Sequence, residues 1–387
     1  MAVRGMRLDG IGGPDNARSR KFGPRMPLSS PARHLPASEF ARRVKGLRAH
    51  QSRLALDAVL VITEVNRYYF TGLQASNGVL LLAAAPAFHT DFRYLAVARK
   101  RLPSLAVRPL WRPADEQETL AKMGRGWRRV GYEGAMAAAR FGALRDALPQ
   151  AEWVDISDVI GEMRSVKSVA EQRAVRNAAR ANDAVFADVR KHIREGMREW
   201  DVRNLIRRGM DAAGQGEAFD TIVCAGKNSA ECHHHSDETA IRANRPVLID
   251  MGVRLDHYCS DMTRSFCMGE PPPFYREVYG IVLEANRKAI RAIRPGRACA
   301  EIDAVARQHI AAAGYGKCFG HSLGHSLGLE VHESPSFAPT CETVLRPGMV
   351  LTVEPGIYFP GRFGIRIEDI ILVTPTGCDV LSETERN

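Results

Sequence analysis

Two aspartates eleven residues apart are the first candidates for chemistry. Asp250 and Asp261 each belong to a strand-like run, and the residues between the runs, Arg254–His257, are few enough for a hairpin turn. A symmetric hairpin places the two aspartates opposite each other, with Cβ atoms about 5 Å apart. Carboxylates this close repel, so a shared proton, a basic partner or a cation must compensate. For this hairpin alone, a salt bridge to Arg254 or Arg264 explains the pair equally well.

A histidine-rich segment supplies imidazoles to the same candidate site. His321, His325 and His332 fall within twelve residues, beside glycines that let backbones and ligands approach closely. A single histidine is usually a satisfied core or surface residue. Three of the chain's 12 histidines in one short segment indicate a polar site, and histidine is a common metal ligand and acid–base group.

Two glutamates lie in apolar runs near the C-terminus. Glu354 ends the run at 349–353 and precedes Pro-Gly, and Glu368 follows Ile365-Arg366-Ile367. An ionised glutamate in an apolar strand costs several kcal/mol unless it is paired. Arg366 can pair with one glutamate, but it cannot readily satisfy both together with two aspartates.

The charges of these five residues predict a metal centre. Asp250, Asp261, His325, Glu354 and Glu368 carry four negative charges, which two divalent cations would neutralise. Oxygen-rich ligands with one imidazole suit Mn²⁺, with Co²⁺, Zn²⁺ or Fe²⁺ as alternatives. Such ions lower the pKa of a bound water and polarise a carbonyl, which indicates a hydrolase. The run Cys232–His235 could instead form a zinc site, but adjacent residues rarely converge on one ion and no C-x-x-C pair exists.

The elements that must position these residues alternate between helical and strand patterns. Residues 37–162 are predicted to form an α/β domain, with a helix at Glu39–Leu54 capped by Ser38 and strands at 58–62 and 79–82. A second α/β domain is predicted at 163–387. It begins with a long helical stretch, Ser165–Lys191, that bridges from the first domain. The chain of 387 residues is long enough for two such cores.

An internal repeat divides the second domain. Ile193–Gly196 recurs as Ile293–Gly296, and Gly214 recurs as Gly314, all at an offset of 100 residues. Each copy has a turned start, a helix of about 15 residues and a glycine near the helix end. We therefore predict a duplicated α/β half, with the site between the two halves.

The charge distribution argues against a nucleic-acid partner. The net charge is +10, but residues 1–36 hold seven Arg/Lys and two Asp, which is half of the excess. This Gly-, Pro- and Ser-rich tail is predicted to be solvated and disordered. A transit peptide and a true start at Met26 are the alternatives.

The cysteines and the apolar runs indicate a cytoplasmic protein. All eight cysteines follow residue 220 and none forms a C-x-x-C pair, so reduced thiols are expected. No secretory signal is expected at the start, and no apolar run reaches the roughly 18 residues that span a membrane.

The motifs together resemble the pita-bread metallopeptidases, a family that includes methionine aminopeptidase, aminopeptidase P and prolidase. The matching motifs are Asp250 with Asp261-Met262-Thr263-Arg264, the run Gly324–Gly328 around His325, Glu354-Pro355-Gly356 and Arg366–Asp369. The resemblance covers about residues 38–387. It implies a pita-bread fold of two duplicated α/β halves, preceded by a smaller creatinase-type α/β domain, and it implies the five metal ligands named above.

Within this family the sequence looks like the Xaa-Pro branch. That branch has a histidine seventeen residues before the first Asp, matching His233, and others that match His321 and His332. The resemblance implies that His332 stabilises the tetrahedral intermediate, and that His233 and His321 shape the proline pocket and shuttle protons. Glu354 would also take the proton of a hydroxide that bridges two metals, and Arg366 would hold a substrate carboxylate or order the metal shell. Cys232, Ser322 and Ser326 depart from common family residues.

The predicted function is a metal-dependent peptidase that cleaves between an N-terminal residue and proline. Its substrate would be a proline-containing peptide, and its metal would be Mn²⁺. The resemblance implies that it assembles as a homodimer. Prolidase acts on dipeptides and aminopeptidase P on longer peptides, and the sequence does not separate them. The alternatives are a creatinase-like amidinohydrolase on the same fold and a non-catalytic module that binds nucleic acid through the basic tail.

Overall fold

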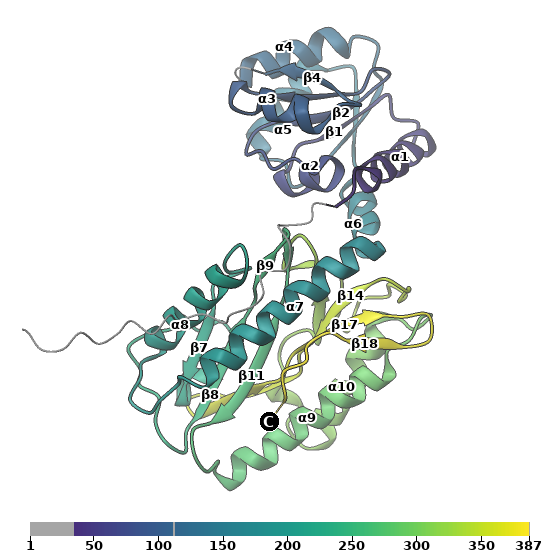
Figure 1. Ribbon diagram of the computed structural model, residues 1–387. Helices are drawn as coiled ribbons and strands as arrows, with labels where there is room; N and C mark the ends of the chain where they lie inside the picture. The colour runs from purple at the N-terminus through teal and green to yellow at the C-terminus, as the bar shows by residue number, and fades with distance from the viewer. Residues whose placement is uncertain (1–34, 111–112, 387) are drawn as a thin grey trace, which may run out of the picture.

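The computed structural model describes residues 35–110 and 113–386, so the basic tail at 1–34 lies outside the described residues. The chain folds into two parts, the N-terminal one above the C-terminal one in Figure 1. The N-terminal part is a mixed six-stranded sheet with the order β4-β3-β2-β1-β5-β6. Its elements are α1 (Ala37–Arg53), β1 (Ala58–Val61), α2 (Glu64–Thr71), β2 (Val79–Leu82), β3 (Ala87–Thr90), α3 (Phe92–Arg101), β4 (Ala106–Pro109), α4 (Pro113–Met123), β5 (Arg129–Tyr132), α5 (Ala138–Ala147), β6 (Glu152–Asp155) and α6 (Ser157–Ser165).

The centre of this sheet is apolar on both faces. β1 pairs with β2 in antiparallel and with β5 in parallel orientation, and every residue of β1 is buried. Because successive strand side chains point to opposite faces, Val59 and Val61 join one core cluster while Ala58 and Leu60 join another. The predicted strands are therefore confirmed as the middle of a two-faced sheet.

One detail of the first helix differs from the prediction. α1 begins at Ala37, so Ser38 lies inside its first turn, and Pro36 occupies the N-cap position without a side-chain cap. The helix begins earlier than predicted because Pro36, with its extended backbone, already ends the preceding segment.

The C-terminal part contains the four long helices α7–α10 and several short sheets. In Figure 1, α7 crosses in front of the strands, and α9 and α10 lie along the lower edge. Its strands form a sheet of order β11-β8-β7, a sheet of order β13-β12-β14-β17-β18 and two-stranded pairs. The elements are α7 (Val169–Arg190), α8 (Glu199–Ala213), β7 (Ile222–Ala225), a 3₁₀ turn (Gly226–Ala230), β8 (Pro246–Met251), β9 (Arg254–Leu255), β10 (Tyr258–Cys259), β11 (Met262–Cys267), α9 (Pro273–Ala292), α10 (Cys299–Ala312), a 3₁₀ turn (Gly316–Cys318), β12 (Gly324–Ser326), β13 (Glu333–Phe337), β14 (Val350–Val353), β15 (Gly356–Phe359), β16 (Phe363–Arg366), β17 (Asp369–Val373) and β18 (Cys378–Val380).

The structure repeats at the offset of 100 residues that the sequence indicates. Gly196 and Gly296 have left-handed φ values of 88° and 89° just before α8 and α10. Each glycine donates its N–H to an extended segment, to Ile241 O at 2.9 Å and to Leu345 O at 3.0 Å. The same backbone device therefore starts the same helix in both halves, and the predicted duplication is confirmed.

The hairpin register differs from the predicted one by two residues. Asp250 pairs with Thr263 rather than facing Asp261. The turn is a tight one at Asp256 and His257, whose φ values of 50° and 70° are left-handed. A turn two residues long at this place shifts the partner strand, so the prediction of directly opposed aspartates is wrong. Because the shift is even, both aspartates still belong to the same face of the ribbon.

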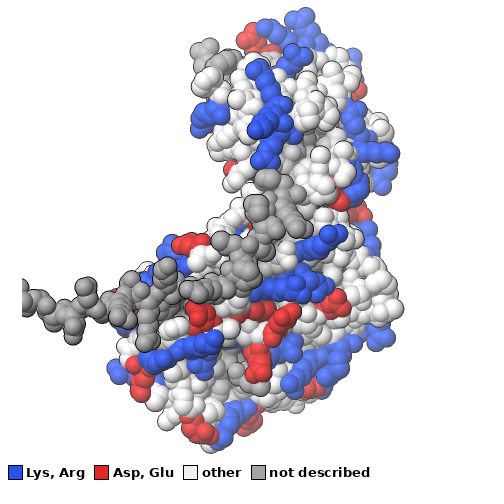
Figure 2. Space-filling view, in the orientation of Figure 1, with Lys and Arg blue, Asp and Glu red and all other residues white. Residues whose placement is uncertain are grey.

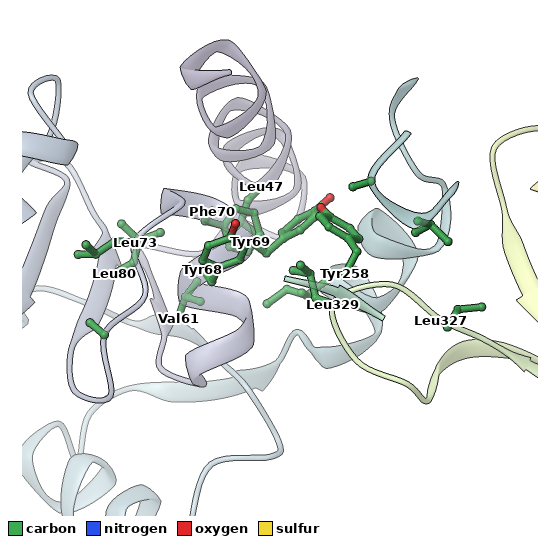
Figure 3. Packing of buried hydrophobic residues seen from close by; sticks show 14 of the residues in the cluster. Leu47, Val61, Tyr68, Tyr69, Phe70, Leu73, Leu80, Tyr258, Leu327 and Leu329 are labelled. Carbon is green, nitrogen blue, oxygen red and sulfur yellow. The ribbon is translucent and has the colours of Figure 1, made fainter. Parts of the chain in front are cut away.

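A hydrophobic cluster joins the two parts of the chain. Figure 3 shows Tyr68, Tyr69 and Phe70 of α2 close to Tyr258 and Leu329 of the C-terminal part. A buried ion pair accompanies the cluster, with Arg43 Nη2 3.1 Å from Glu171 Oε1. This apolar contact, together with a paired charge, joins the N-terminal part to the C-terminal part. The boundary proposed between residues 162 and 163 falls within α6, three residues before its end, and stays a prediction.

The distribution of surface charge and the state of the cysteines relate to the predictions about partners and location. Figure 2 shows Lys and Arg spread over both parts of the visible face, interleaved with Asp and Glu on the lower part. All eight cysteines are free. Across residues 35–110 and 113–386, none of the helices has the length and apolar character that a membrane crossing requires.

Candidate metal centre and active site

The five predicted ligands come from strands of both halves. Asp250 lies near the end of β8, and Asp261 stands just before β11. From the second half, His325 is the middle residue of β12, Glu354 follows β14, and Glu368 precedes β17. Strand ends leave backbone polar groups and side chains pointing into the space between the sheets, so these positions can share one site.

The distances bring the ligands together. His325 Nε2 lies 3.4 Å from Glu354 Oε1 and 3.8 Å from Asp261 Oδ2. One ligand atom from each of Asp261, His325 and Glu368 lies within 4.8 Å of the others. All five residues line a single cavity of about 780 Å³.

The carboxylates of this cavity are strongly perturbed. Burial raises the pKa of Asp261 well above its usual range, and Glu368, Asp250 and Glu354 raise it further. Burial likewise raises the pKa of Glu368, with Glu354 and Asp250 adding to the effect. Burial also raises the pKa of Glu354 to about 7, against the opposing charge of Arg366. The protein alone therefore does not stabilise this many ionised acids.

His325 presents a lone pair to these acids. Burial lowers the pKa of His325 to about 4, so the imidazole is neutral at neutral pH. Its Nδ1 lies 3.2 Å from the Ser326 carbonyl oxygen, which only accepts, so the proton sits on Nδ1. The Nε2 lone pair then faces two carboxylates, an arrangement that a cation between them would make favourable.

The donor set therefore fits divalent cations. Asp250 Oδ1 is buried with no hydrogen-bond partner among the described residues, which leaves it free as a ligand atom. Four carboxylates and one neutral imidazole match Mn²⁺ and related ions in both charge and ligand type. The alternative explanations by simple salt bridges fail, since Arg254 donates to the carbonyls of Ala218 and Leu329, and Arg264 pairs with Asp369.

Arg366 lies at the edge of this site. Its Nη2 donates to Asp250 Oδ2 at 2.6 Å, so it pairs with an aspartate rather than with a glutamate as predicted. Its Nε donates to Thr263 Oγ1 at 2.9 Å, and its Nη1 donates to the Tyr358 hydroxyl at 3.1 Å. With all three nitrogens engaged, Arg366 is fixed in place beside the candidate ligands.

The three predicted catalytic histidines line the same cavity. His233, His321 and His332 all contribute to its wall. The ring of His332 lies 4.4 Å from that of His325, centroid to centroid. Burial lowers the pKa of His321 to about 4, and the Arg366 charge acts in the same direction.

A hydrogen-bond chain fixes the tautomer of His321. Its Nδ1 lies 2.8 Å from the Ser322 carbonyl oxygen, so Nδ1 carries the proton. Its Nε2, 3.0 Å from the Tyr358 hydroxyl, must then accept from that hydroxyl. The Tyr358 hydroxyl in turn accepts from Arg366, so it links His321 to the arginine beside the candidate ligands.

Hydroxyl residues are the part of the site that the sequence did not reveal. Thr263 donates to Glu368 Oε2 at 2.7 Å, and Thr352 donates to Glu354 Oε1 at 3.2 Å. Tyr358 connects Arg366 to His321. Threonine and tyrosine are common in strands, so their type carries no signal, but each lies two to five residues from a predicted ligand.

A second group of possible ligands lies nearby. Glu199, His234 and Asp237 place ligand atoms within 4.8 Å of one another. His234 Nε2 lies 2.7 Å from Glu199 Oε2, and Asn228 Nδ2 donates to Glu199 Oε1 at 3.0 Å. The polar groups of this cluster are paired with each other, and among the described residues Cys232 and His235 do not join it. The predicted alternative of a zinc site at Cys232–His235 is therefore not supported.

The fold and the site define a two-part metallopeptidase with pita-bread architecture. Residues 173–375 match the metallopeptidase family M24, and residues 43–166 match the creatinase/prolidase N-terminal domain. The chain belongs to metallopeptidase family M24, and it is a peptidase.

Individual relatives extend over almost the whole chain. A Xaa-Pro dipeptidase of Pyrococcus horikoshii is 35% identical over 349 residues, covering 89% of this chain and 97% of that protein. The solved Xaa-Pro dipeptidase from Bacillus anthracis has a TM-score of 0.86 and 34% identity, covering 90% of this chain and 99% of that one. The X-Pro aminopeptidase of Thermotoga maritima has a TM-score of 0.80 and 32% identity, covering 87% and 99%.

Proposed function

We propose that the protein is a metal-dependent Xaa-Pro peptidase that hydrolyses the bond between an N-terminal residue and proline. The observation that carries the proposal is the convergence of Asp261, His325 and Glu368, whose ligand atoms lie within 4.8 Å of one another in one cavity. The names of relatives that cover 87–90% of this chain support the substrate class, since they include Xaa-Pro dipeptidases and an X-Pro aminopeptidase.

Asp250, Asp261, His325, Glu354 and Glu368 would hold two divalent ions, Mn²⁺ being the best match to the ligand types. When bound, the ions would lower the pKa of a water molecule and polarise the scissile carbonyl. Thr263 and Thr352 orient Glu368 and Glu354 by donating to their carboxylates. The site thus has its ligands and the groups that orient them.

The remaining residues would act on the substrate. Glu354, which lines the cavity beside His325, would accept a proton from the attacking water. His332 is exposed and lines the cavity, and its N–H would stabilise the developing oxyanion. His233 and His321 would shape the proline pocket and pass a proton to the departing proline nitrogen.

Arg366 would have an ordering role rather than a direct one. Its nitrogens already donate to Asp250, Thr263 and Tyr358, so ordering the ligand shell is the better of its two predicted roles. A homodimer and a cytoplasmic location are further parts of the proposal. The eight free thiols support that location.

Substrate length separates the two activities within this proposal. The experiment compares Ala-Pro with Ala-Pro-Ala, using protein stripped with chelator and reloaded with Mn²⁺, and Asp261→Ala as the matched control. Release of alanine from either peptide, lost on chelation and in the variant, supports the proposal. The absence of metal-dependent cleavage of both peptides would overturn it in favour of another hydrolase on this fold.

A further inference from the structure

We propose that Glu333, held by Lys167 and Arg164, is a positioning residue that fixes His332 in the active site. The inference rests on the role given to His332 in the proposed function. It also assigns a task to the junction of the two parts of the chain, because Arg164 lies in α6 and Lys167 in the short segment between α6 and α7.

The three side chains form a buried charge network. Arg164 Nη2 lies 2.6 Å from Glu333 Oε1, and Lys167 Nζ lies 3.2 Å from Glu333 Oε2. The exposed fractions of these side chains are 9% for Arg164, 1% for Lys167 and 5% for Glu333. Burying such charges is costly and weak evidence for stability alone, so a role in specifying one local conformation is the better explanation.

The loop that carries His332 is wrapped around the Glu333 carboxylate. Glu333 Oε1 accepts the backbone N–H of Glu330 at 3.2 Å. Gly328 packs directly on this carboxylate, and a Cβ at that position would meet Glu333 Oε1 at 2.8 Å. The backbone N–H of Gly328 also donates to Glu330 O at 2.9 Å. The carboxylate is therefore the centre around which residues 328–333 turn.

His332 depends on this loop for its position. Its imidazole makes no hydrogen bond to another residue in the described part of the chain and contacts the ring of His325. The backbone, and above all the anchored neighbour Glu333, must then set the place of the ring. A displacement of the order of 1 Å at such a group lowers a rate by up to about a hundredfold.

The same network reaches two other parts of the molecule. Arg164 Nη1 donates to Asn66 Oδ1 at 2.8 Å, in α2 of the N-terminal part. Lys167 Nζ donates to Ser326 Oγ at 2.8 Å, next to the candidate ligand His325. Arg164 and Lys167 thus connect this junction to α2, to the His332 loop and to β12.

A double-mutant cycle tests the positioning role on the full chain. Lys167→Met is made alone and in a His332→Ala background, and Ala-Pro or Ala-Pro-Ala hydrolysis is measured per folded, Mn²⁺-loaded molecule. The expected result is a loss of kcat of about tenfold or more from Lys167→Met alone, with little change in KM, and no further loss in the His332→Ala background. The control is Arg346→Met, which removes an exposed ion pair with Glu162 of α6. We expect this variant to leave kcat unchanged.

A purely structural network gives a different pattern. Lys167→Met would then lower Tm while kcat per folded molecule stayed the same, or it would lower kcat equally in both backgrounds, and either result overturns the proposal. If Lys167→Met does not fold, Glu333→Gln takes its place, because its amide oxygen can still accept from the Glu330 N–H.

A spectroscopic readout separates this proposal from the proposed function. In histidine-labelled protein, the ring resonance lost in His332→Ala identifies His332. We expect that resonance to shift or broaden in Lys167→Met and to stay unchanged in Arg346→Met. An unchanged resonance in Lys167→Met would contradict the positioning role, whether or not the wild-type protein cleaves Xaa-Pro peptides.

Discussion

Arg366 Nη2 donates to Asp250 Oδ2 at 2.6 Å, while Oδ1 of the same buried carboxylate has no partner among the described residues. One oxygen of Asp250 is thus neutralised by a fixed cation, and the other is left for a ligand. The site as a whole has the same imbalance of charge. It contains four carboxylates, and Arg366 neutralises only one of them.

Removal of the Arg366 charge should be most damaging in the metal-free protein. Arg366→Met leaves Asp250 as an unpaired buried charge, so we expect a loss of about 3–5 kcal/mol in the free energy of unfolding. Mn²⁺ should recover part of this loss, since an ion that binds the folded state stabilises it. Urea unfolding with and without metal measures both effects, with the exposed Arg276→Met as control. Equal losses in the two states would contradict this account.

Asp261→Asn should stabilise the metal-free protein while abolishing activity. Burial and the acidic neighbours destabilise the ionised form of Asp261. The isosteric amide carries no charge and avoids this cost. At pH 8 we expect the free energy of unfolding to rise by about 1–3 kcal/mol. Peptide hydrolysis should fall by more than about a hundredfold, because a ligand is lost. A variant that is less stable without metal than the wild type would show that Asp261 is a structural acid.

The stability of the metal-free protein should decline as the pH rises. Burial raises the pKa of Glu354 from 4.5 to about 7 in the folded state, so the folded chain binds more protons than the unfolded chain between these values. Stability is then highest below pH 4.5 for this group and is lost as the pH approaches 7. Thermal or urea unfolding between pH 5 and 8 should show a loss of at least about 1.4 kcal/mol, the value of one pKa unit.

The matched experiment uses Mn²⁺-loaded protein over the same pH range. Its stability should not decline in this way, because the ions bind the ionised carboxylates. A metal-free protein that becomes more stable from pH 5 to 8 would contradict the arrangement of acids described above.

Gly324 should tolerate no side chain. A Cβ at Gly324 would overlap the carbonyl oxygen of Thr352 in the neighbouring strand, whereas a Cβ at Gly320 would meet nothing within 4 Å. Gly324→Ala should therefore push β12 away from β14, lower the stability by about 1–3 kcal/mol and weaken Mn²⁺ binding through His325. Gly320→Ala should leave both unchanged. Calorimetric titration with Mn²⁺ measures the affinity, and equal affinities for the two variants would sink this explanation.

The sequence predicts the fold better than it predicts the geometry of the site. The duplicated halves are visible as a repeat at an offset of 100 residues, whereas Asp250, Asp261, His325, Glu354 and Glu368 stay predicted ligands, proposed because acids in apolar strands need a compensating charge. The hairpin register was missed because the turn uses left-handed Asp256 and His257 instead of glycine or asparagine at both central positions. Tyr358 was missed because its contacts with Arg366 and His321 depend on the fold of β15 and β16.

The most direct test of the central claim is metal-dependent hydrolysis of Ala-Pro and Ala-Pro-Ala by one purified preparation. After chelation the protein should cleave neither peptide, and Mn²⁺ should restore release of alanine from at least one of them. Cleavage of the dipeptide alone would make the enzyme a dipeptidase, and cleavage of the tripeptide would make it an aminopeptidase. A reloaded protein that cleaves neither peptide, with its metal bound, would contradict the Xaa-Pro peptidase assignment.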